Sequence, residues 1–364
     1  MPCDSRVSEA SGLLQMEGNF MQTYSAQALH RLSSAIFRAV GAPEDIADDV
    51  SAVLIDNHLA GHDSHGIIRI PQYVKCVRNG ETNPTARPSI VTEAASTALV
   101  RGNWAFGQIV ANLAADLVVT KAAETGLAAV AVVEACHTGR LAAFIESAAI
   151  DAGVAVFMTT GTGGAGRTAP YGGAGNALGT NPVAFAVPDG AGGAITLDYA
   201  TTGVAAGKVR VALAKDEPLP EGVMLDKDGK PTTNPADFET GFLLPFGGHK
   251  GYALAVISDL LSGPLAGADA YPGVVERAGL FLFGVSTTAF RDAEGYRKAV
   301  AKFVARVKAV PPAQGFDEVL MPGEPENRAR KEREVSGIPV PDKTWKAVSE
   351  LADELGVDIS KLLG

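Results

Sequence analysis

The fold class of this chain is decided by residues 107–160, GQIVANLAADLVVTKAAETGLAAVAVVEACHTGRLAAFIESAAIDAGVAVFMTT. A helical segment precedes the apolar run at 127–133, and a second helical segment separates that run from another at 154–160. Short apolar runs that alternate with helices across brief connections are typical of strands in a parallel or mixed sheet. The stretch therefore predicts an α/β protein.

The flanking segments extend this pattern. An apolar stripe predicts a helix over 25–40, and acidic residues after Pro43 predict a second helix over 43–60. Further along the chain we expect strands over 181–188, 194–200, 208–214 and 280–287, and helices over 250–263, 326–335 and 341–355. Turn-forming residues predict that 218–238 is a long surface excursion.

Length and composition limit the class of protein. The chain has 364 residues and a formal net charge of −10, which predicts two or three domains and argues against nucleic-acid binding. Its cysteines, Cys3, Cys76 and Cys136, are odd in number and widely spaced, so we expect no disulfide framework and a cytoplasmic location. The sequence has neither a membrane-length apolar run nor a secretory signal, so we expect no membrane partner. Residues 1–22 are expected to form an extension.

Glycine is unusually frequent, with 41 residues, and its densest group lies at 161–179. Gly161, Gly163 and Gly166 match the GxGxxG fingerprint of Rossmann dinucleotide sites. In those sites a helix follows the motif and receives the pyrophosphate. Here Pro170 and four more glycines follow, which disfavours a helix. We interpret the segment as a loop close to a ligand or to another subunit.

Three histidines, His58, His62 and His65, form the second cluster of interest. On one continuous helix their spacing would place all three imidazoles on one face, where they could bind zinc. Gly61 interrupts that helix, and the alternative is that His58 and His62 form local hydrogen bonds at its end. We expect no metal, and keep a metal-dependent hydrolase or lyase as an alternative.

The segment DSHGIIRIPQY at 63–73 combines residues suited to acid chemistry. Asp63 or Ser64 is expected to cap a short helix that carries Arg69 and Tyr73. His65 is a candidate proton donor with Ser64 as its hydrogen-bond partner, and Arg69 can bind a carboxylate. These are the minimum requirements for acting on a 2-oxo or 2-hydroxy acid.

Two further segments place polar residues at predicted helix starts, where backbone N–H groups suit phosphate. They are HTGRL at 137–141 and FGGHKGYAL at 246–254, and Lys250 in the second can offset phosphate charge.

Eight segments in order along the chain resemble the malate/L-lactate dehydrogenase family of NAD(P)-dependent oxidoreductases, which lacks the Rossmann fold. They are GHDSHGIIRIPQY, TAPYGG, LGTNPVAFAVP, LDYATTGVAAGKV, LPEGVMLDKDGKPTTNP, LLPFGGHKGYAL, MPGEPE and GIPVPDKTW. The resemblance implies a mixed-sheet cofactor domain at 91–290 and a largely helical domain from both chain ends, 23–90 and 291–364. A homodimer is also implied.

The resemblance assigns roles to individual residues. It implies a proton donor at His65 with Ser64 as its partner, or at His137, and a substrate carboxylate on Arg69, with Thr180 and Gly207 facing the substrate. Lys208 stands among the catalytic candidates, where the cyclic-imine reductases of the family have an aspartate. The implied contacts to NAD or NADP are His137, Thr138, Gly139, Arg140, Leu141, Asp198, Tyr199, Ala200, His249, Lys250, Pro322, Gly323 and Glu324.

The function expected from these observations is NAD(P)H-dependent reduction of a small 2-oxo acid to the 2-hydroxy acid, and the reverse reaction. Hydride passes between the nicotinamide and the substrate C2 while an imidazole moves the proton on the oxygen. The alternative within the family is reduction of a cyclic imino acid of the piperideine- or pyrroline-2-carboxylate type. Lys208 favours 2-oxo acids, because the imine reductases have an aspartate there.

Overall fold

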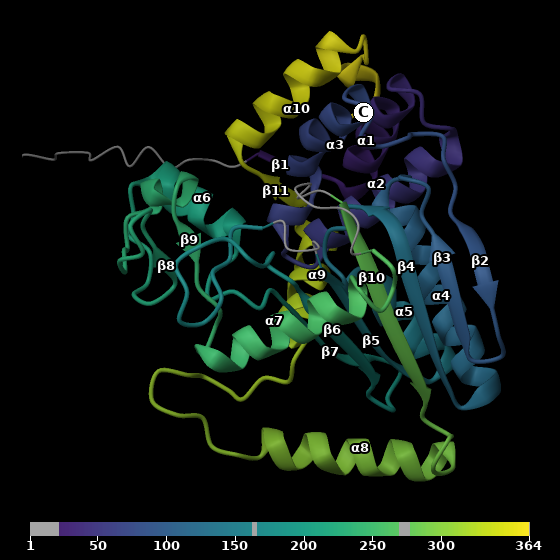
Figure 1. The fold of residues 1–364 in the computed structure, drawn as a ribbon. Coiled ribbons are helices and arrows are strands. Elements are labelled where there is room, and N and C mark those ends of the chain that lie inside the picture. The colour runs from purple at the N-terminus through teal and green to yellow at the C-terminus, as the bar shows by residue number, and fades with distance from the viewer. Residues whose placement is uncertain (1–21, 162–165, 269–276, 364) are drawn as a thin grey trace, which may run out of the picture.

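The structure is a computed structural model that describes residues 22–161, 166–268 and 277–363. Its centre is a seven-stranded mixed sheet (Figure 1). The strands in spatial order are β2 (Ser89–Glu93), β3 (Thr97–Arg101), β4 (Leu127–Cys136), β10 (Arg277–Ser286), β5 (Val154–Gly161), β6 (Val183–Pro188) and β7 (Ala194–Tyr199). Only β3 and β4 pair in parallel; the other neighbours in this sheet are antiparallel. The predicted α/β class and mixed sheet are confirmed.

The two faces of the sheet differ in how they are covered. Helices α4 (Gly107–Thr125) and α5 (Ala142–Ala152) pack on one face, where alternate residues of β4, β5, β6 and β10 form the larger hydrophobic core. Helix α7 (His249–Ser262) crosses the other face, close enough that a side chain on Gly279 of β10 would overlap the Ser262 carbonyl (Figure 1).

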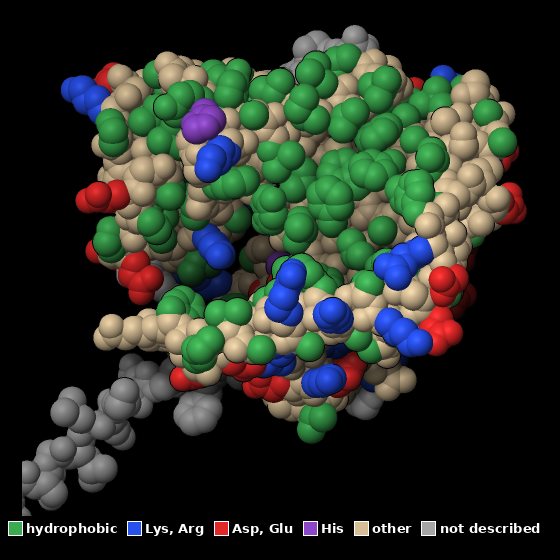
Figure 2. Space-filling view, turned by 90° about the horizontal axis from the view of Figure 1, so that it is seen from below, with side chains coloured by type: hydrophobic (Ala, Val, Ile, Leu, Met, Phe, Trp, Pro, Cys, Tyr) green, Lys and Arg blue, Asp and Glu red, His purple; other side chains and the backbone are tan. Residues whose placement is uncertain are grey.

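The face that carries α7 has a row of aromatic side chains. Phe283, Phe157 and Phe185 stand opposite one another on β10, β5 and β6, on the side of the sheet away from the core residues. Phe185 and Phe283 are 36% and 38% exposed. Seen from below, the molecule has a wide area of hydrophobic side chains (Figure 2).

A helical layer above the sheet joins the two ends of the described chain. It contains α1 (Ala26–Ala39), α2 (Glu44–Leu59), α3 (Ile70–Arg78) and α10 (Asp342–Glu354), which share a second hydrophobic core. Strand β1 (Gln22–Tyr24) pairs with β11 (Ile338–Val340), and Tyr24 stacks on Trp345. The short turn η4 (Ile359–Lys361) follows α10.

Two other C-terminal helices, α8 and α9, lie outside this helical layer. Helix α8 (Ala293–Lys308) lies along the lower end of the sheet, where the Tyr296 hydroxyl donates to the Pro188 carbonyl at 2.7 Å (Figure 1). Helix α9 (Glu324–Ser336) packs against α2. The domain limits implied by the family, which group 291–364 with 23–90, stay a prediction.

One predicted strand is wrong. Residues 208–214 lie in helix α6 (Ala206–Lys215), because Ala206, Val209 and Ala212 recur every three residues and face a small core of their own. That core belongs to a lobe with β8 (Met224–Leu225), η3 (Pro235–Glu239) and β9 (Phe242–Leu243). The predicted surface excursion at 218–238 therefore contains buried residues, such as Met224.

Two further observations concern the sequence predictions. The middle of the GxGxxG match, 162–165, lies outside the described residues, and residues 166–182 form bends, turns and bridges with no helix among them. Of the helices within the described ranges, none is both long enough and apolar enough to cross a bilayer.

Candidate active site

The segment after α2 forms a compact double turn rather than the predicted capped helix. Asp63–His65 and Ile67–Arg69 are separate 3₁₀ turns, η1 and η2, and α3 begins only at Ile70. The Asp63 carboxylate does not cap a helix, because it is drawn toward His58 and Arg333. The prediction that Asp63 or Ser64 is an N-cap is therefore wrong.

His58 is the buried support of this double turn. Its Nε2 accepts the Ile67 backbone N–H at 3.0 Å, so the ring hydrogen is on Nδ1, which lies 2.9 Å from Asp63 Oδ1. A side chain at Gly66 would overlap the His58 ring, so this position needs glycine. The local hydrogen-bond interpretation is confirmed for His58, whereas His62 Nε2 lies 3.4 Å from Glu326 Oε1 of α9.

The structure does not support a zinc site formed by His58, His62 and His65. His58 has no nitrogen left for a metal, and His62 and His65 lie beyond the end of α2. Within the described ranges, no three His, Cys, Asp or Glu side chains are arranged to hold a metal ion.

The double turn places the residues of the predicted acid site side by side. Ser64 Oγ lies 3.0 Å from His65 Nδ1. Arg69 donates from Nε to the Ser64 carbonyl and from Nη1 to Gln72 Oε1, both at 2.7 Å. These two bonds fix the plane of the guanidinium beside the imidazole. The start of α6 is also here, because a Cβ on Gly207 would lie 3.0 Å from the Ser64 Cβ.

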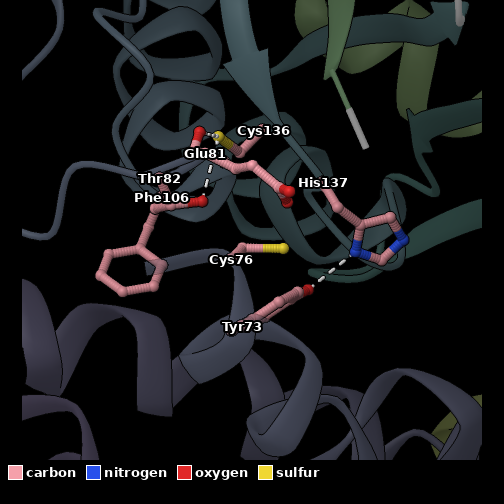
Figure 3. Close-up of a pocket in the computed structure, with 8 residues that line it drawn as sticks. Tyr73, Cys76, Glu81, Thr82, Phe106, Cys136 and His137 are labelled. Carbon is pink, nitrogen blue, oxygen red and sulfur yellow. Dashed lines mark hydrogen bonds between the residues drawn. The ribbon is translucent and has the colours of Figure 1, made fainter. Parts of the chain in front are cut away.

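A second histidine joins this group from the end of β4. The rings of His137 and His65 are nearly parallel, with centroids 6.0 Å apart. The Tyr73 hydroxyl lies 2.8 Å from His137 Nδ1, and both residues line a cavity of about 10 Å³ with Cys76, Glu81 and others (Figure 3). The structure thus brings together both proton-donor candidates that the sequence left open.

Sequence reasoning missed Gln108, which connects these groups. Its Nε2 lies 3.0 Å from the Tyr73 hydroxyl and 3.0 Å from the Thr138 carbonyl, and the residue is fully buried. A glutamine among the apolar residues of the first turn of α4 was the only signal in the sequence, since buried polar side chains need hydrogen-bond partners.

Both histidines are neutral at pH 7. Burial lowers the pKa of His65 to about 3, and the positive charge of Arg69 adds to the effect. Burial and then Arg69 and His65 hold the pKa of His137 well below its usual value.

The predicted cofactor residues around α5 are mostly internal. The side chains of Thr138, Arg140 and Leu141 are buried, and Arg140 contacts Glu146 at 2.7 Å. Asp198 Oδ2 accepts the Ala142 N–H at 2.8 Å, so it takes one of the helix-start N–H groups expected to suit phosphate. Burial raises the pKa of Asp198 to about 6, although the backbone hydrogen bonds and Arg140 oppose it.

The other predicted cofactor residues converge on the start of α7. Gly247 and Gly248 both have positive φ there, Lys250 is exposed in the first turn, and the His249 ring lies against Tyr171. Tyr199, next to Ala200 at the end of β7, contacts Phe246 edge-on. The N–H groups of Lys250, Gly251 and Tyr252 bond to the carbonyls of Gly247, Phe246 and Gly248, so the charge of Lys250 beside the glycine turn is what fits a phosphate of a dinucleotide.

Five other predicted residues lie in three places away from that turn or on its edge. The Thr180 carbonyl accepts two hydrogen bonds from Thr201, one from its backbone N–H and one from its side-chain hydroxyl, both at 2.9 Å. The segment with Pro322, Gly323 and Glu324 packs on β7, where the Pro322 carbonyl accepts the Thr196 N–H at 3.2 Å. Lys208 is exposed in the first turn of α6.

Helix α9 ties the double turn to the rest of the protein. Arg333 contacts Asp63 Oδ1 and the His58 carbonyl, each at 2.5 Å, and Arg330 pairs with Asp56 of α2. Burial alone would raise the pKa of Asp63, but the hydrogen bonds from His58 and Arg333 outweigh it and lower the pKa below 3.8.

Comparison with known proteins agrees with this geometry. A family model described as malate/L-lactate dehydrogenase matches residues 24–349. The chain is 35% identical over 333 residues to the malate/(S)-sulfolactate dehydrogenase of Methanothermus fervidus, covering 89% of this chain and 96% of that one. It is 36% identical over 343 residues to hydroxycarboxylate dehydrogenase B of Escherichia coli O157:H7, covering 92% and 94%.

A solved structure leads to the same result. The sulfolactate dehydrogenase from Methanocaldococcus jannaschii matches with a TM-score of 0.84 at 33% identity, covering 93% of this chain and 99% of that one. The fold and these comparisons together define a dehydrogenase built on a mixed sheet in place of a Rossmann sheet. The chain belongs to the malate/L-lactate dehydrogenase family, and it is an oxidoreductase.

The anchoring role of Arg333 gives a first prediction. We expect Arg333→Met to lower the free energy of unfolding by about 1–2 kcal/mol at pH 7, because a charged hydrogen-bond network is lost. The pKa of Asp63 is depressed in the folded state, so this difference from wild type shrinks as the pH falls below 3.8. Urea unfolding at several pH values measures both effects.

The matched control is Arg328→Met on the same helix, whose partner Glu318 is exposed. This change should cost less than about 1 kcal/mol. Equal losses in the two variants would contradict the anchoring role of Arg333.

Proposed function

We propose that this enzyme reduces a small 2-oxo acid to the 2-hydroxy acid with NADH or NADPH, and catalyses the reverse oxidation. The observation that carries the proposal is the grouping of Arg69 with two neutral imidazoles, His65 and His137, around one point. A guanidinium binds a carboxylate bidentately, and an imidazole can transfer the proton on the neighbouring oxygen. The names of the relatives, which act on malate, sulfolactate and other hydroxycarboxylates, support the same substrate class.

The electrostatics of the site couple substrate binding to proton transfer. In the free protein, the charge of Arg69 helps to keep both histidines unprotonated. A substrate carboxylate on Arg69 offsets that charge, so binding raises the pKa of both imidazoles toward the working range. The site is therefore expected to hold a proton more readily with substrate bound than without it.

The cofactor proposed for this site is a nicotinamide dinucleotide, which supplies or accepts the hydride when bound. The residues that would hold it are the glycine turn and Lys250 at the start of α7, Tyr199 at the end of β7, and the segment 322–324 on β7. Either NAD or NADP fits this set, and no metal is required by the proposed chemistry.

A substrate panel tests the proposal. Purified protein should oxidise NADH or NADPH with at least one small 2-oxo acid, measured as loss of absorbance by the reduced cofactor. A cyclic imine 2-carboxylate in the same panel tests the second activity considered for this family, and we expect a lower kcat/KM for it because Lys208 replaces an acidic residue. No turnover with any 2-oxo acid and either cofactor would sink the proposal.

The carboxylate-binding role of Arg69 is testable on its own. Arg69→Lys should raise KM for the 2-oxo acid about 10- to 100-fold, because lysine cannot keep both anchoring bonds or bind bidentately. The dissociation constant for the cofactor, measured by fluorescence, should change little. The control Arg78→Lys, an exposed pair with Glu354 at the end of α3, should leave both unchanged; equal losses of substrate and cofactor binding by Arg69→Lys would argue against the role.

We propose further that the enzyme is a cytoplasmic homodimer. Cys76 and Cys136 are buried as thiols and not joined in a disulfide, which suits a reducing compartment. The wide hydrophobic area in Figure 2, the partly exposed phenylalanine row on the sheet and the exposed Ile257 and Leu260 of α7 are the kind of apolar surface that marks a protein–protein interface. A second copy of the chain is the proposed cover.

A charge in the row should separate the subunits. Phe185→Asp, at 36% exposure, should convert the dimer to a monomer at micromolar concentration, as measured by analytical ultracentrifugation. Val335→Asp on α9, at 90% exposure, is the control and should stay dimeric. A wild-type protein that sediments as a monomer would refute the dimer.

A further inference from the structure

The guanidinium of Arg69 is held by neutral groups. Its Nε donates to the Ser64 carbonyl and its Nη1 donates to Gln72 Oε1, both at 2.7 Å. It forms no ion pair with any residue in the part of the chain that the structure describes. The two groups that fix its plane are therefore neutral acceptors, one a backbone carbonyl and the other a side-chain amide.

Two other arginines near the double turn have a carboxylate partner instead. Arg333 contacts both oxygens of Asp63, and Arg140 contacts Glu146 at 2.7 Å. A carboxylate beside an arginine offsets its positive charge and weakens its attraction for a further anion. Arg69 differs from these two arginines because the protein leaves its charge available.

The available charge of Arg69 is felt by both imidazoles of the site. Burial is the largest cause of the lowered pKa of His65 and of His137, and the charge of Arg69 comes next for each ring. No carboxylate of the described residues contributes to either lowered pKa. The electrostatics of the two rings therefore agree with the hydrogen bonds of the guanidinium.

Gln72 supplies its neutral contact through the oxygen of the side-chain amide. A guanidinium only donates hydrogen bonds, so the amide atom that faces Nη1 must be the oxygen. Gln72 lies in the first turn of α3, three residues after Arg69, which is a spacing at which side chains on a helix meet. Gln72→Glu would keep the length of the side chain and place a carboxylate against the guanidinium.

The two bonds leave part of the Arg69 guanidinium for a ligand. Of its five N–H groups, Nε uses one and Nη1 uses one, so three remain on the two terminal nitrogens. A ligand carboxylate can bind there through both oxygens. The amide of Gln72 thus fixes the guanidinium without neutralising the charge that such a ligand needs.

We propose that Gln72 is a positioning residue that anchors Arg69 through a neutral oxygen, so that the site selects ligands with a carboxylate. The contact between Arg69 and Gln72 is a property of the free protein, whereas the identity of the ligand as a 2-oxo acid rests on the proposed function. The residue at position 72 thereby determines how strongly the site prefers an acid to its neutral ester.

Two variants of Gln72 separate the effect of the hydrogen bond from the effect of the charge. Gln72→Met removes the acceptor and keeps a side chain of similar length, whereas Gln72→Glu keeps an acceptor and adds a negative charge. The probe is oxamate, a stable analogue of a 2-oxo acid, and its neutral ethyl ester is the reference ligand. Isothermal titration calorimetry, with and without NADH, measures the dissociation constant of each ligand.

The two variants should weaken oxamate binding in a fixed order. We expect a loss of about 3- to 10-fold in Gln72→Met, because one of the two bonds that fix the guanidinium is removed. Gln72→Glu should lose at least about 10-fold more, because the new carboxylate pairs with Arg69 and repels the ligand. The ester should bind alike to all three proteins, since it brings no charge to Arg69. A change that merely distorts the site would weaken both ligands.

The matched control is Lys75→Gln, which makes the same change in net charge at an exposed position of α3. Its affinity for oxamate should stay within about a factor of two of wild type, because solvent and salt screen an exposed charge. Circular dichroism and urea unfolding show whether each variant is folded. If Gln72→Glu does not fold, an unchanged oxamate affinity in Gln72→Met would still overturn the proposal.

The outcomes distinguish this inference from the proposed function. An oxamate affinity of Gln72→Glu equal to that of wild type or of Gln72→Met would overturn the role of Gln72, even if the enzyme reduces 2-oxo acids. A wild-type protein that binds no oxamate would overturn it as well. The reverse result, the expected order of oxamate affinities with no turnover of any 2-oxo acid, would refute the proposed function alone.

Discussion

The site depends on the hydrogen bonds that the buried imidazole of His58 makes to the double turn. The imidazole receives the Ile67 N–H on one nitrogen and contacts Asp63 with the other, and it lies against Gly66 so closely that no side chain fits there. Asn57, the residue before it on α2, donates to the His65 carbonyl. The end of one helix therefore fixes the double turn from inside. Ser64, His65 and Arg69 inherit their positions from that turn.

The charged side chains differ between the two sides of this turn. Arg330 and Arg333 of α9 pair with Asp56 and Asp63, which holds the outer side of the turn. On the inner side, Arg69 faces two imidazoles that burial keeps neutral. A cation beside neutral histidines attracts an anionic substrate, and this local charge is effective despite the net charge of −10.

Hydrophobic periodicity in the sequence was sufficient to predict the long helices. The helices at α1, α2, α7 and α10 begin and end close to the predicted residues, since each has a stripe or a cap that local sequence reveals. The prediction failed at 208–214, where alternating valines suggested a strand. There the burial of Val209 beside Ala206 and Ala212 in a small core favoured a helix. Strands β2 and β3 were not predicted, and β2 is exposed along its whole length, so it carries little hydrophobic pattern.

For the site, the sequence by itself determined the local group Ser64, His65 and Arg69, because these residues lie within one short turn. It also determined the family, since eight segments occur in order. The resemblance implied roles for His137 and Gly207, and the tertiary structure showed that these two residues, Tyr73 and Gln108 meet this group. It also showed that His58 supports the turn instead of binding a metal. The reason is physical: spacing along a chain fixes contacts within a turn. Hydrogen bonds between residues 29 to 64 positions apart depend on how helices and sheet pack together.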